Sequence, residues 1–242
     1  MAFLLRLRLM PTYRGYTEKQ IVSLIDHTLL KPEATQSDLE SCISTAIAAD
    51  VMAMCIRPMD VKHSAEALKG TAVRLCTVIG FPHGTVTTHT KVQETIEAVS
   101  NGAIEVDMVM NLGLFASKEY EAVQNDIAEV VKAAKSTNPE AEVKVILETC
   151  LWSEEEIVKA CEITEAAGAD YVKTSTGFAA SGATPEVIAL MRKTVGDRLG
   201  VKASGGVRTL DALIDMAQAG ASRVGASGTT AILLEFAEKS SE

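Results

Sequence analysis

The chain has 242 residues, of which 47% are hydrophobic and 23% charged, and its formal net charge is −9. An acidic surface argues against a nucleic-acid or anionic-membrane partner, although a local cationic site could still bind a small anionic substrate. No apolar run in the sequence is long enough to span a bilayer.

The first 20 residues are predicted to form an N-terminal extension ahead of a single catalytic domain over residues 21–242. Residues 1–17 contain three arginines and no acid, which is compatible with a weak transit peptide. A poorly ordered extension is the simpler interpretation.

From residue 24 onward, strand-like and helix-like segments alternate. The predicted strands are 24–29, 51–56, 74–79, 105–110, 143–149, 171–176, 200–204 and 223–227. The predicted helices are 36–49, 59–69, 88–101, 117–136, 153–167, 185–195, 209–219 and 228–238. Alternation of this kind indicates βαβ units and a parallel sheet.

Local signals support these boundaries. Gly102, Gly168 and Gly220 stand where helices stop, and Ser153 and Thr184 are N-cap residues at helix starts. An unbroken series of eight strands and eight helices predicts an α/β fold, a closed (β/α)₈ TIM barrel. A doubly wound open sheet is the alternative, but no G-x-G-x-x-G fingerprint follows an early strand.

Charged residues collect on the inward-facing positions of five predicted strands. In 105–110 the residues Val106, Met108 and Met110 are apolar and should face the helices, so Glu105 and Asp107 should face the barrel axis. The same alternation turns inward a further set: Asp26, Lys144, Lys173 and Lys202. A buried ion-pair network is one interpretation, but the joint pattern favours chemistry.

Lys173 and Lys202 are the strongest single candidates. Each lies in a strand that reads as buried and is followed by small residues and glycine. Burying a lysine is costly, and two neighbouring ammonium groups disfavour each other's charge. Because a neutral amine is a nucleophile, this pair predicts covalent catalysis by a lysine.

Five motifs together resemble the deoxyribose-phosphate aldolase family, over about residues 21–235. They are Ile25-Asp-His-Thr-Leu-Leu-Lys-Pro-Glu-Ala-Thr35, Val78-Ile-Gly-Phe-Pro-His-Gly84, Glu105-Val-Asp107, Tyr171-Val-Lys-Thr-Ser-Thr-Gly177 and Lys202-Ala-Ser-Gly-Gly-Val-Arg-Thr209. The resemblance implies a TIM barrel and a class I aldolase that needs no metal or other cofactor. Such an enzyme reversibly joins acetaldehyde to glyceraldehyde 3-phosphate, which gives 2-deoxyribose 5-phosphate.

The resemblance also implies residue roles. Lys173 would be the Schiff-base lysine, with Asp107 and Lys202 as proton-relay partners, and Cys55 falls where some members have an active-site cysteine. Packing in the barrel interior is the plainer reading of Cys55. The substrate and phosphate contacts would fall on Thr176, Gly177, Gly205, Gly206, Ser227 and Gly228.

Some assignments keep a structural alternative. Glycine-rich loops after strands seven and eight are typical of phosphate sites in TIM barrels, but tight turns also need glycine. Asp26 and Thr28 are predicted either to contact a substrate hydroxyl or to shape a turn. Phe178 follows the Lys-Thr-Ser-Thr-Gly motif where some members have a cation, and the tail lacks the terminal tyrosine that some members use near the site.

The remaining residues limit other functions. The four histidines show no metal-binding spacing, so no metal site is predicted. Five cysteines without a C-x-x-C pair indicate reduced thiols in a cytoplasmic protein. Barrels of this kind often dimerise, so a homodimer is the assembly considered. Another Schiff-base aldolase, a sugar-phosphate isomerase and a silent phosphate-binding protein remain alternatives.

Overall fold

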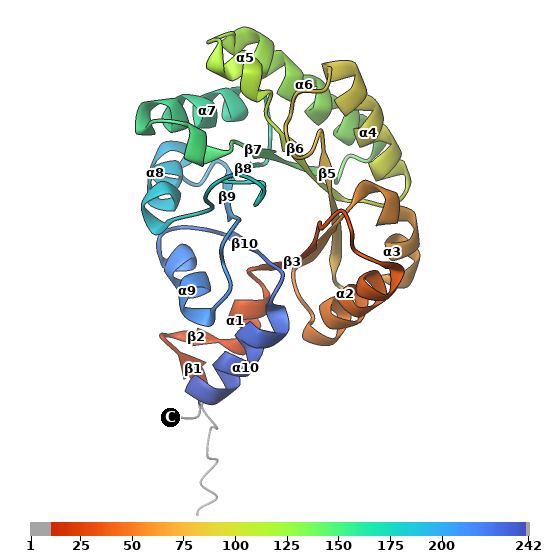
Figure 1. Ribbon diagram of the computed structural model, residues 1–242, viewed down its shortest axis with the longest axis vertical. Coiled ribbons are helices and arrows are strands. Elements are labelled where there is room, and N and C mark those ends of the chain that lie inside the picture. The colour runs from red at the N-terminus through yellow and green to blue at the C-terminus, as the bar shows by residue number, and fades with distance from the viewer. Residues whose placement is uncertain (1–10, 241–242) are drawn as a thin grey trace, which may run out of the picture.

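The computed structural model describes residues 11–240, and its centre is a closed parallel barrel (Figure 1). Each strand pairs with the next along the chain, and the last closes the barrel against the first. The predicted (β/α)₈ TIM barrel is confirmed. Its strands are β3 (Ile25–Leu29), β4 (Ala53–Ile56), β5 (Arg74–Ile79), β6 (Glu105–Val109), β7 (Glu142–Ile146), β8 (Tyr171–Lys173), β9 (Gly200–Ala203) and β10 (Arg223–Ala226).

Helices surround the barrel on its outside (Figure 1). They are α2 (Gln36–Ala49), α3 (Val61–Ala67), α4 (Thr88–Ser100), α5 (Leu112–Ala116), α6 (Tyr120–Thr137), α7 (Glu154–Ala166), α8 (Pro185–Val195), α9 (Leu210–Gln218) and α10 (Thr229–Lys239), with 3₁₀ turns η1 (Pro58–Asp60) and η2 (Thr149–Leu151). Over residues 11–240, no helix combines the length and apolar character needed to cross a bilayer.

Local sequence fixes several helix starts. Ser153 begins α7 with a capping box, in which its hydroxyl accepts from the Glu156 N–H and the Glu156 side chain accepts from the Ser153 N–H. Thr184 caps α8 ahead of Pro185. Such caps satisfy N–H groups that have no partner within the helix, so the predicted starts are confirmed.

The strands of the barrel have two chemically different faces. On β6, Val106 and Met108 are fully buried in the apolar layer between strands and helices, whereas Glu105 and Asp107 point into the barrel interior, where they form ion pairs. The apolar layer supplies the packing that stabilises the fold. The interior, termed the lumen below, is left for charged groups.

The strand predicted at 171–176 is shorter in the structure because its last residues leave the sheet. β8 ends at Lys173, and Thr176 bonds instead to the carboxylate of Glu148. Glu148 has a left-handed backbone with φ of 54° and lies beyond the end of β7. The helix predicted at 117–136 is present as α6, Tyr120–Thr137. The short α5, which was not predicted, ends before that range, and Lys118 with φ of 61° separates the two helices.

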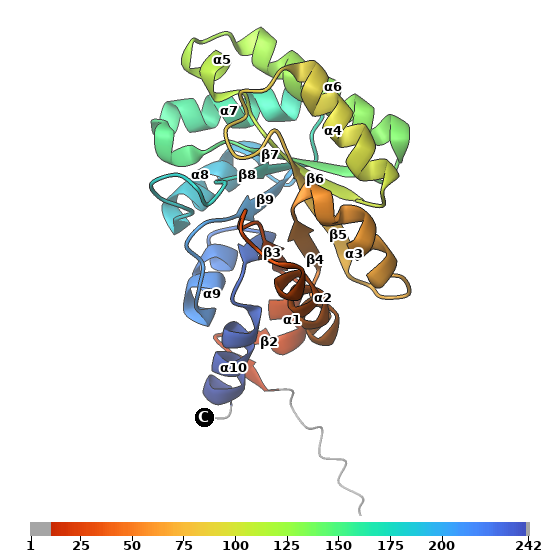
Figure 2. The same cartoon turned by 45° about the vertical axis from the view of Figure 1, so that its right-hand side comes forward.

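Part of the predicted N-terminal extension is structured. Residues 12–17 form a hairpin of β1 (Thr12–Tyr13) and β2 (Tyr16–Thr17), followed by α1 (Glu18–Val22). The Tyr13 hydroxyl donates to Asp211 of α9 at 3.0 Å, and the hairpin lies close to α10 in both views (Figures 1 and 2). The transit-peptide and disorder hypotheses otherwise concern residues 1–10, which lie outside the described residues.

Candidate active site

Lys173, Lys202 and Asp107 meet in the lumen. Lys173 and Lys202 are register partners on adjacent strands, and Asp107 lies across the lumen on β6. The Asp107 Oδ2 atom accepts hydrogen bonds from both lysines, at 2.7 Å from Lys173 Nζ and 2.7 Å from Lys202 Nζ. All three side chains are buried. The structure therefore brings together the three residues that the sequence singled out.

Burial and charge act against each other on these groups. Burial alone would raise the pKa of Asp107, but Lys144, Lys173 and Lys202 hold it well below its usual range. Burial would likewise lower the pKa of Lys202, but Asp107 and Asp26 raise it well above its usual value. Asp107 is therefore an anion and Lys202 a cation around neutral pH. An anion that accepts from two amines can exchange protons with either of them.

A cavity of about 380 Å³ opens over Lys173 at the C-terminal ends of the strands. This is the end of the barrel at which TIM-barrel enzymes carry their active sites. Its lining includes most of the predicted contact residues, namely Thr28, Thr176, Gly177, Gly205, Gly206 and Ser227. Five predicted residues are not part of that lining. Asp26, Cys55 and Asp107 are buried on the strands, Lys202 lies beside Lys173, and Gly228 is the N-cap residue of α10.

The glycine-rich end of the cavity has a backbone that other residues rarely adopt. Gly205 and Gly206 have φ of +84° and +85°, in the left-handed region. Gly182 packs so closely on this turn that a Cβ atom there would lie 2.0 Å from the Gly205 carbonyl oxygen. The adjacent Gly228 begins α10 without any side-chain cap. Glycine turns next to a helix start can offer backbone N–H groups to an anion.

Phe178 occupies the position where some family members carry a cation. Its side chain is 51% exposed, and its ring packs edge-on against Phe81 with centroids 5.3 Å apart. Arg208 lines the same cavity from the loop after β9. Within residues 11–240 its guanidinium forms no hydrogen bond or ion pair, so a positive charge is available from a different loop.

Comparison with known proteins agrees with this geometry. A family model described as DeoC/LacD family aldolase matches residues 20–236. The chain belongs to this family. It is 55% identical to the deoxyribose-phosphate aldolase of Lysinibacillus sphaericus over 89% of the chain and 96% of that protein. It is 54% identical to the enzyme of that name from Bacillus cereus, over 92% of the chain and 98% of that protein.

Solved structures place the fold in the same family. The deoxyribose-phosphate aldolase of Aeropyrum pernix, described as tetrameric, superposes with a TM-score of 0.85 at 33% identity, over 91% of this chain and 92% of the other. An aldolase named QR15 gives a TM-score of 0.85 at 40% identity, over 90% and 96%. The predicted resemblance and enzyme class are confirmed: the chain is an aldolase, and hence a lyase.

Two thiols lie near Lys173 and Lys202. Cys55 and Cys76 are register partners on β4 and β5, and their sulfur atoms and an Asp107 oxygen lie within 4.8 Å of one another. Such a set could ligate a soft metal ion, but Asp107 already contacts the Nζ atoms of Lys144, Lys173 and Lys202. Nearby cations oppose metal binding. All five cysteines are free, and the cytoplasmic location remains a prediction.

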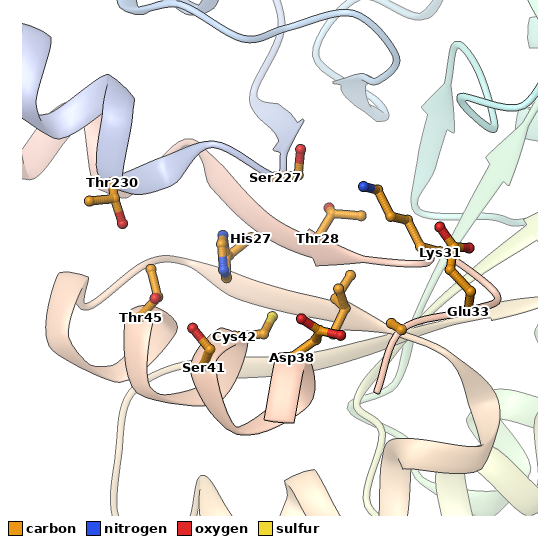
Figure 3. Close-up of a pocket in the computed structure, with 12 residues that line it drawn as sticks. His27, Thr28, Lys31, Glu33, Asp38, Ser41, Cys42, Thr45, Ser227 and Thr230 are labelled. Atoms are coloured by element: carbon orange, nitrogen blue, oxygen red, sulfur yellow. The ribbon is translucent and has the colours of Figure 1, made fainter. Parts of the chain in front are cut away.

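A second cavity of about 530 Å³ adjoins the first (Figure 3). It lies between β3, α2 and the start of α10. It shares Thr28, Leu29, Lys31 and Ser227 with the cavity over Lys173. His27 points into it and bonds through Nδ1 to the Thr229 hydroxyl at 2.8 Å. Burial lowers the pKa of His27.

Sequence reasoning missed some residues around the site. Arg223 of β10 lies in the lumen between Asp26 and Glu105, at 2.6 Å and 2.5 Å. Strand parity could have found it. Arg223 lies two residues before Gly225 and four before Ser227, so alternation along the strand places all three on the same face. The packing of Gly182 on Gly205 had no such signal, since it joins two loops.

Proposed function

We propose that the chain reversibly cleaves 2-deoxy-D-ribose 5-phosphate to acetaldehyde and D-glyceraldehyde 3-phosphate through a Schiff base on Lys173. One observation carries the proposal: Lys173 Nζ lies below an open cavity and shares Asp107 Oδ2 with Lys202 at 2.7 Å. The names of the relatives point to the same substrate.

The chemistry follows from these positions. Lys173 Nζ attacks the C1 aldehyde carbon, and loss of water leaves an iminium ion. The iminium draws electrons from the C2–C3 bond once the C3 hydroxyl loses its proton, so glyceraldehyde 3-phosphate departs and an enamine remains. Protonation of C2 and hydrolysis then release acetaldehyde and restore the amine.

Asp107 and Lys202 serve the proton transfers. Asp107 Oδ2 is placed to relay protons to and from the C3 hydroxyl and the enamine carbon, directly or through one water. The Lys202 ammonium, paired to Asp26 at 2.5 Å, supplies a like charge next to Lys173. A like charge favours the neutral amine that attack requires.

The phosphate would bind at the glycine-rich end of the cavity. Gly205, Gly206, Ser227 and the start of α10 supply backbone N–H groups, and Arg208 supplies a cation. These contacts lie at the mouth of the barrel, whereas the amine lies deeper. The five-carbon substrate would therefore extend from Lys173 toward the rim.

The test is cleavage of 2-deoxyribose 5-phosphate, followed by release of glyceraldehyde 3-phosphate. Borohydride added with acetaldehyde should trap a reduced adduct on Lys173 in the wild type and no adduct in Lys173→Ala. Persistent labelling of that variant would reject the assignment. Loss of activity on borohydride treatment in the presence of substrate also separates this aldolase from an isomerase, which needs no imine.

The oligomeric state and the cytoplasmic location are further proposals. The predicted homodimer and a tetramer like that described for Aeropyrum pernix are distinguished by light scattering on the eluted protein.

A further inference from the structure

Ionisable side chains from every strand of the barrel face the surroundings of Lys173. All are at most 4% exposed, except Tyr171, whose ring lies near Lys144 and Arg223. In strand order they are Asp26 on β3, Cys55 on β4, Cys76 on β5, Glu105 and Asp107 on β6, Lys144 on β7, Tyr171 and Lys173 on β8, Lys202 on β9 and Arg223 on β10. Glu148, just after β7, bonds to Thr176 instead.

Six of these charges form a closed ring of ion pairs, termed the lumen ring. Each member contacts the two beside it, and anions alternate with cations. Around the ring the contacts are Asp107–Lys202 at 2.7 Å, Lys202–Asp26 at 2.5 Å, Asp26–Arg223 at 2.6 Å, Arg223–Glu105 at 2.5 Å, Glu105–Lys144 at 2.5 Å and Lys144–Asp107 at 3.1 Å.

The lumen ring is neutral without Lys173. Its three carboxylates match its three cations. Arg74 of β5 also contacts the ring, at Glu105, but its side chain is 29% exposed and its charge is matched by Glu142 at 3.2 Å. Lys173 is attached from outside the ring. Among the described residues its carboxylate partner is Asp107, through the oxygen that also accepts from Lys202. A proton on Lys173 is therefore the surplus charge of the lumen.

We propose that Glu105, Lys144 and Arg223 are positioning residues, whose charges complete the neutral ring and so keep the amine of Lys173 uncharged for imine formation. The inference rests on the proposed Schiff-base function. It extends that function to residues at the far end of the lumen, which act on Lys173 through Asp107 and Asp26.

Glu105 and Lys144 keep their charges around neutral pH. Although burial opposes it, Lys144 and Arg223 lower the pKa of Glu105 to about 2. Burial also opposes the charge of Lys144, but Asp107 and Glu105 raise its pKa above the usual value. A set of charges that does not titrate near neutrality acts as a fixed field on the group that does.

The thiols complete the account of neighbouring groups. Cys76 donates to Asp107 Oδ1 at 3.2 Å, and burial raises its pKa well above normal, so it is neutral. The Cys76 contact lowers the pKa of Cys55, which also lies near Lys202 and Lys173. Because a Cys55 thiolate would add a negative charge, the test below uses a Cys55→Ser background throughout.

The test measures the charge of Lys173 without turnover. Trace acetylation by acetic anhydride across a pH series, quantified by peptide mass spectrometry, gives the midpoint pH at which Lys173 becomes reactive. Lys144→Met leaves the ring with one excess negative charge and should move the midpoint up by about one pH unit. Glu105→Gln leaves one excess positive charge and should move it down by a similar amount. Midpoints that stay fixed, or move the same way in both variants, overturn the inference.

A double variant that removes one ring charge of each sign provides a second measurement. It does not require a variant with an unbalanced ring to fold. The double variant Lys144→Met/Glu105→Gln removes one charge of each sign, so its midpoint should return to the wild-type value. A midpoint displaced as far as in Lys144→Met overturns the inference. Lys144→Arg, which keeps the charge, should also match the wild type. If Lys144→Met does not fold, Arg74→Gln, at the half-exposed edge of the ring, should give a smaller upward shift, and an unmoved midpoint overturns the inference.

A matched control comes from the helix layer. Lys91 is as buried as Lys144 and pairs with Asp126 at 2.5 Å between α4 and α6, outside the lumen. Lys91→Met should lower stability and leave the Lys173 midpoint unmoved. Failure of the proposed function is distinguishable, because a wild type without cleavage activity still gives midpoints. If the wild type is active but the Lys173 midpoint does not respond to the ring charge, only the role of the ring is rejected and the proposed function stands.

Discussion

The chain buries charge in two regions with different organisation. Between α4 and α6, Lys91 donates to Asp126 at 2.5 Å and to the Val109 carbonyl at 2.9 Å, and Thr88 donates to the other Asp126 oxygen at 2.7 Å. Each charge there has its own partner. In the lumen, Asp107 is shared by three lysines, and Lys173 faces a cavity.

The difference shows which buried charge indicates chemistry. A fully buried pair in a closed layer has no access to a ligand. A shared carboxylate next to an open cavity leaves one amine free to react. Burial of charge is common to both regions, so the sharing and the access distinguish the site.

The largest effect should come from the shared carboxylate. Asp107→Asn removes both the proton relay and the anion that three lysines contact, so kcat for cleavage of 2-deoxyribose 5-phosphate should fall about a thousandfold. Asp126→Asn, the same change in the helix layer, should leave kcat near that of the wild type. Similar kcat values in the two variants would contradict the distinction between the two regions.

The helix-layer pair should instead show its effect in stability. Lys91→Met leaves Asp126 buried and unpaired, which should lower the free energy of unfolding by about 3–5 kcal/mol, measured in urea. The kcat of the folded variant should not change. Lys91→Met/Asp126→Leu removes both charges and should recover most of the stability. No recovery would mean that the pair itself stabilises the fold.

The charge of Glu105 in the lumen should make the free energy of unfolding depend on pH in the acid range. The pKa of Glu105 is about 2, below its unfolded value, so its contribution is present above about pH 4.5 and is lost as pH falls toward 2. The loss is on the order of 3 kcal/mol. Urea titrations between pH 6 and 3 should show a steeper decline for the wild type than for Glu105→Gln. Equal slopes would contradict the assignment.

Most of the fold could be predicted from the sequence because its signals are local. Caps at Ser153 and Thr184, and alternation on β6, depend on residues a few positions apart, and they placed the helices and the inward side of Asp107 correctly. The end of β8 could not be predicted. It depends on the Thr176–Glu148 bond, and that bond joins two loops that meet only in the closed barrel.

The same limit applies to the candidate site. Strand alternation predicted which residues face inward, and it therefore placed Lys173, Lys202 and Asp107 in the same barrel interior. It could not predict that Arg223 lies between Asp26 and Glu105, because closing the ring requires the register of strands far apart in sequence. The roles of these residues remain for the experiments above.

The smallest effect is expected from a charge that is neither buried nor paired. Arg208 lines the cavity over Lys173, and among the described residues its guanidinium has no hydrogen-bonding partner. Arg208→Ala should therefore cost little stability but raise KM for 2-deoxyribose 5-phosphate about tenfold, because a charge-assisted hydrogen bond contributes roughly 1.5–3 kcal/mol. KM for unphosphorylated 2-deoxyribose should not change. An equal rise for both sugars would place Arg208 away from the phosphate, and the glycine-rich backbone would then be the main anion contact.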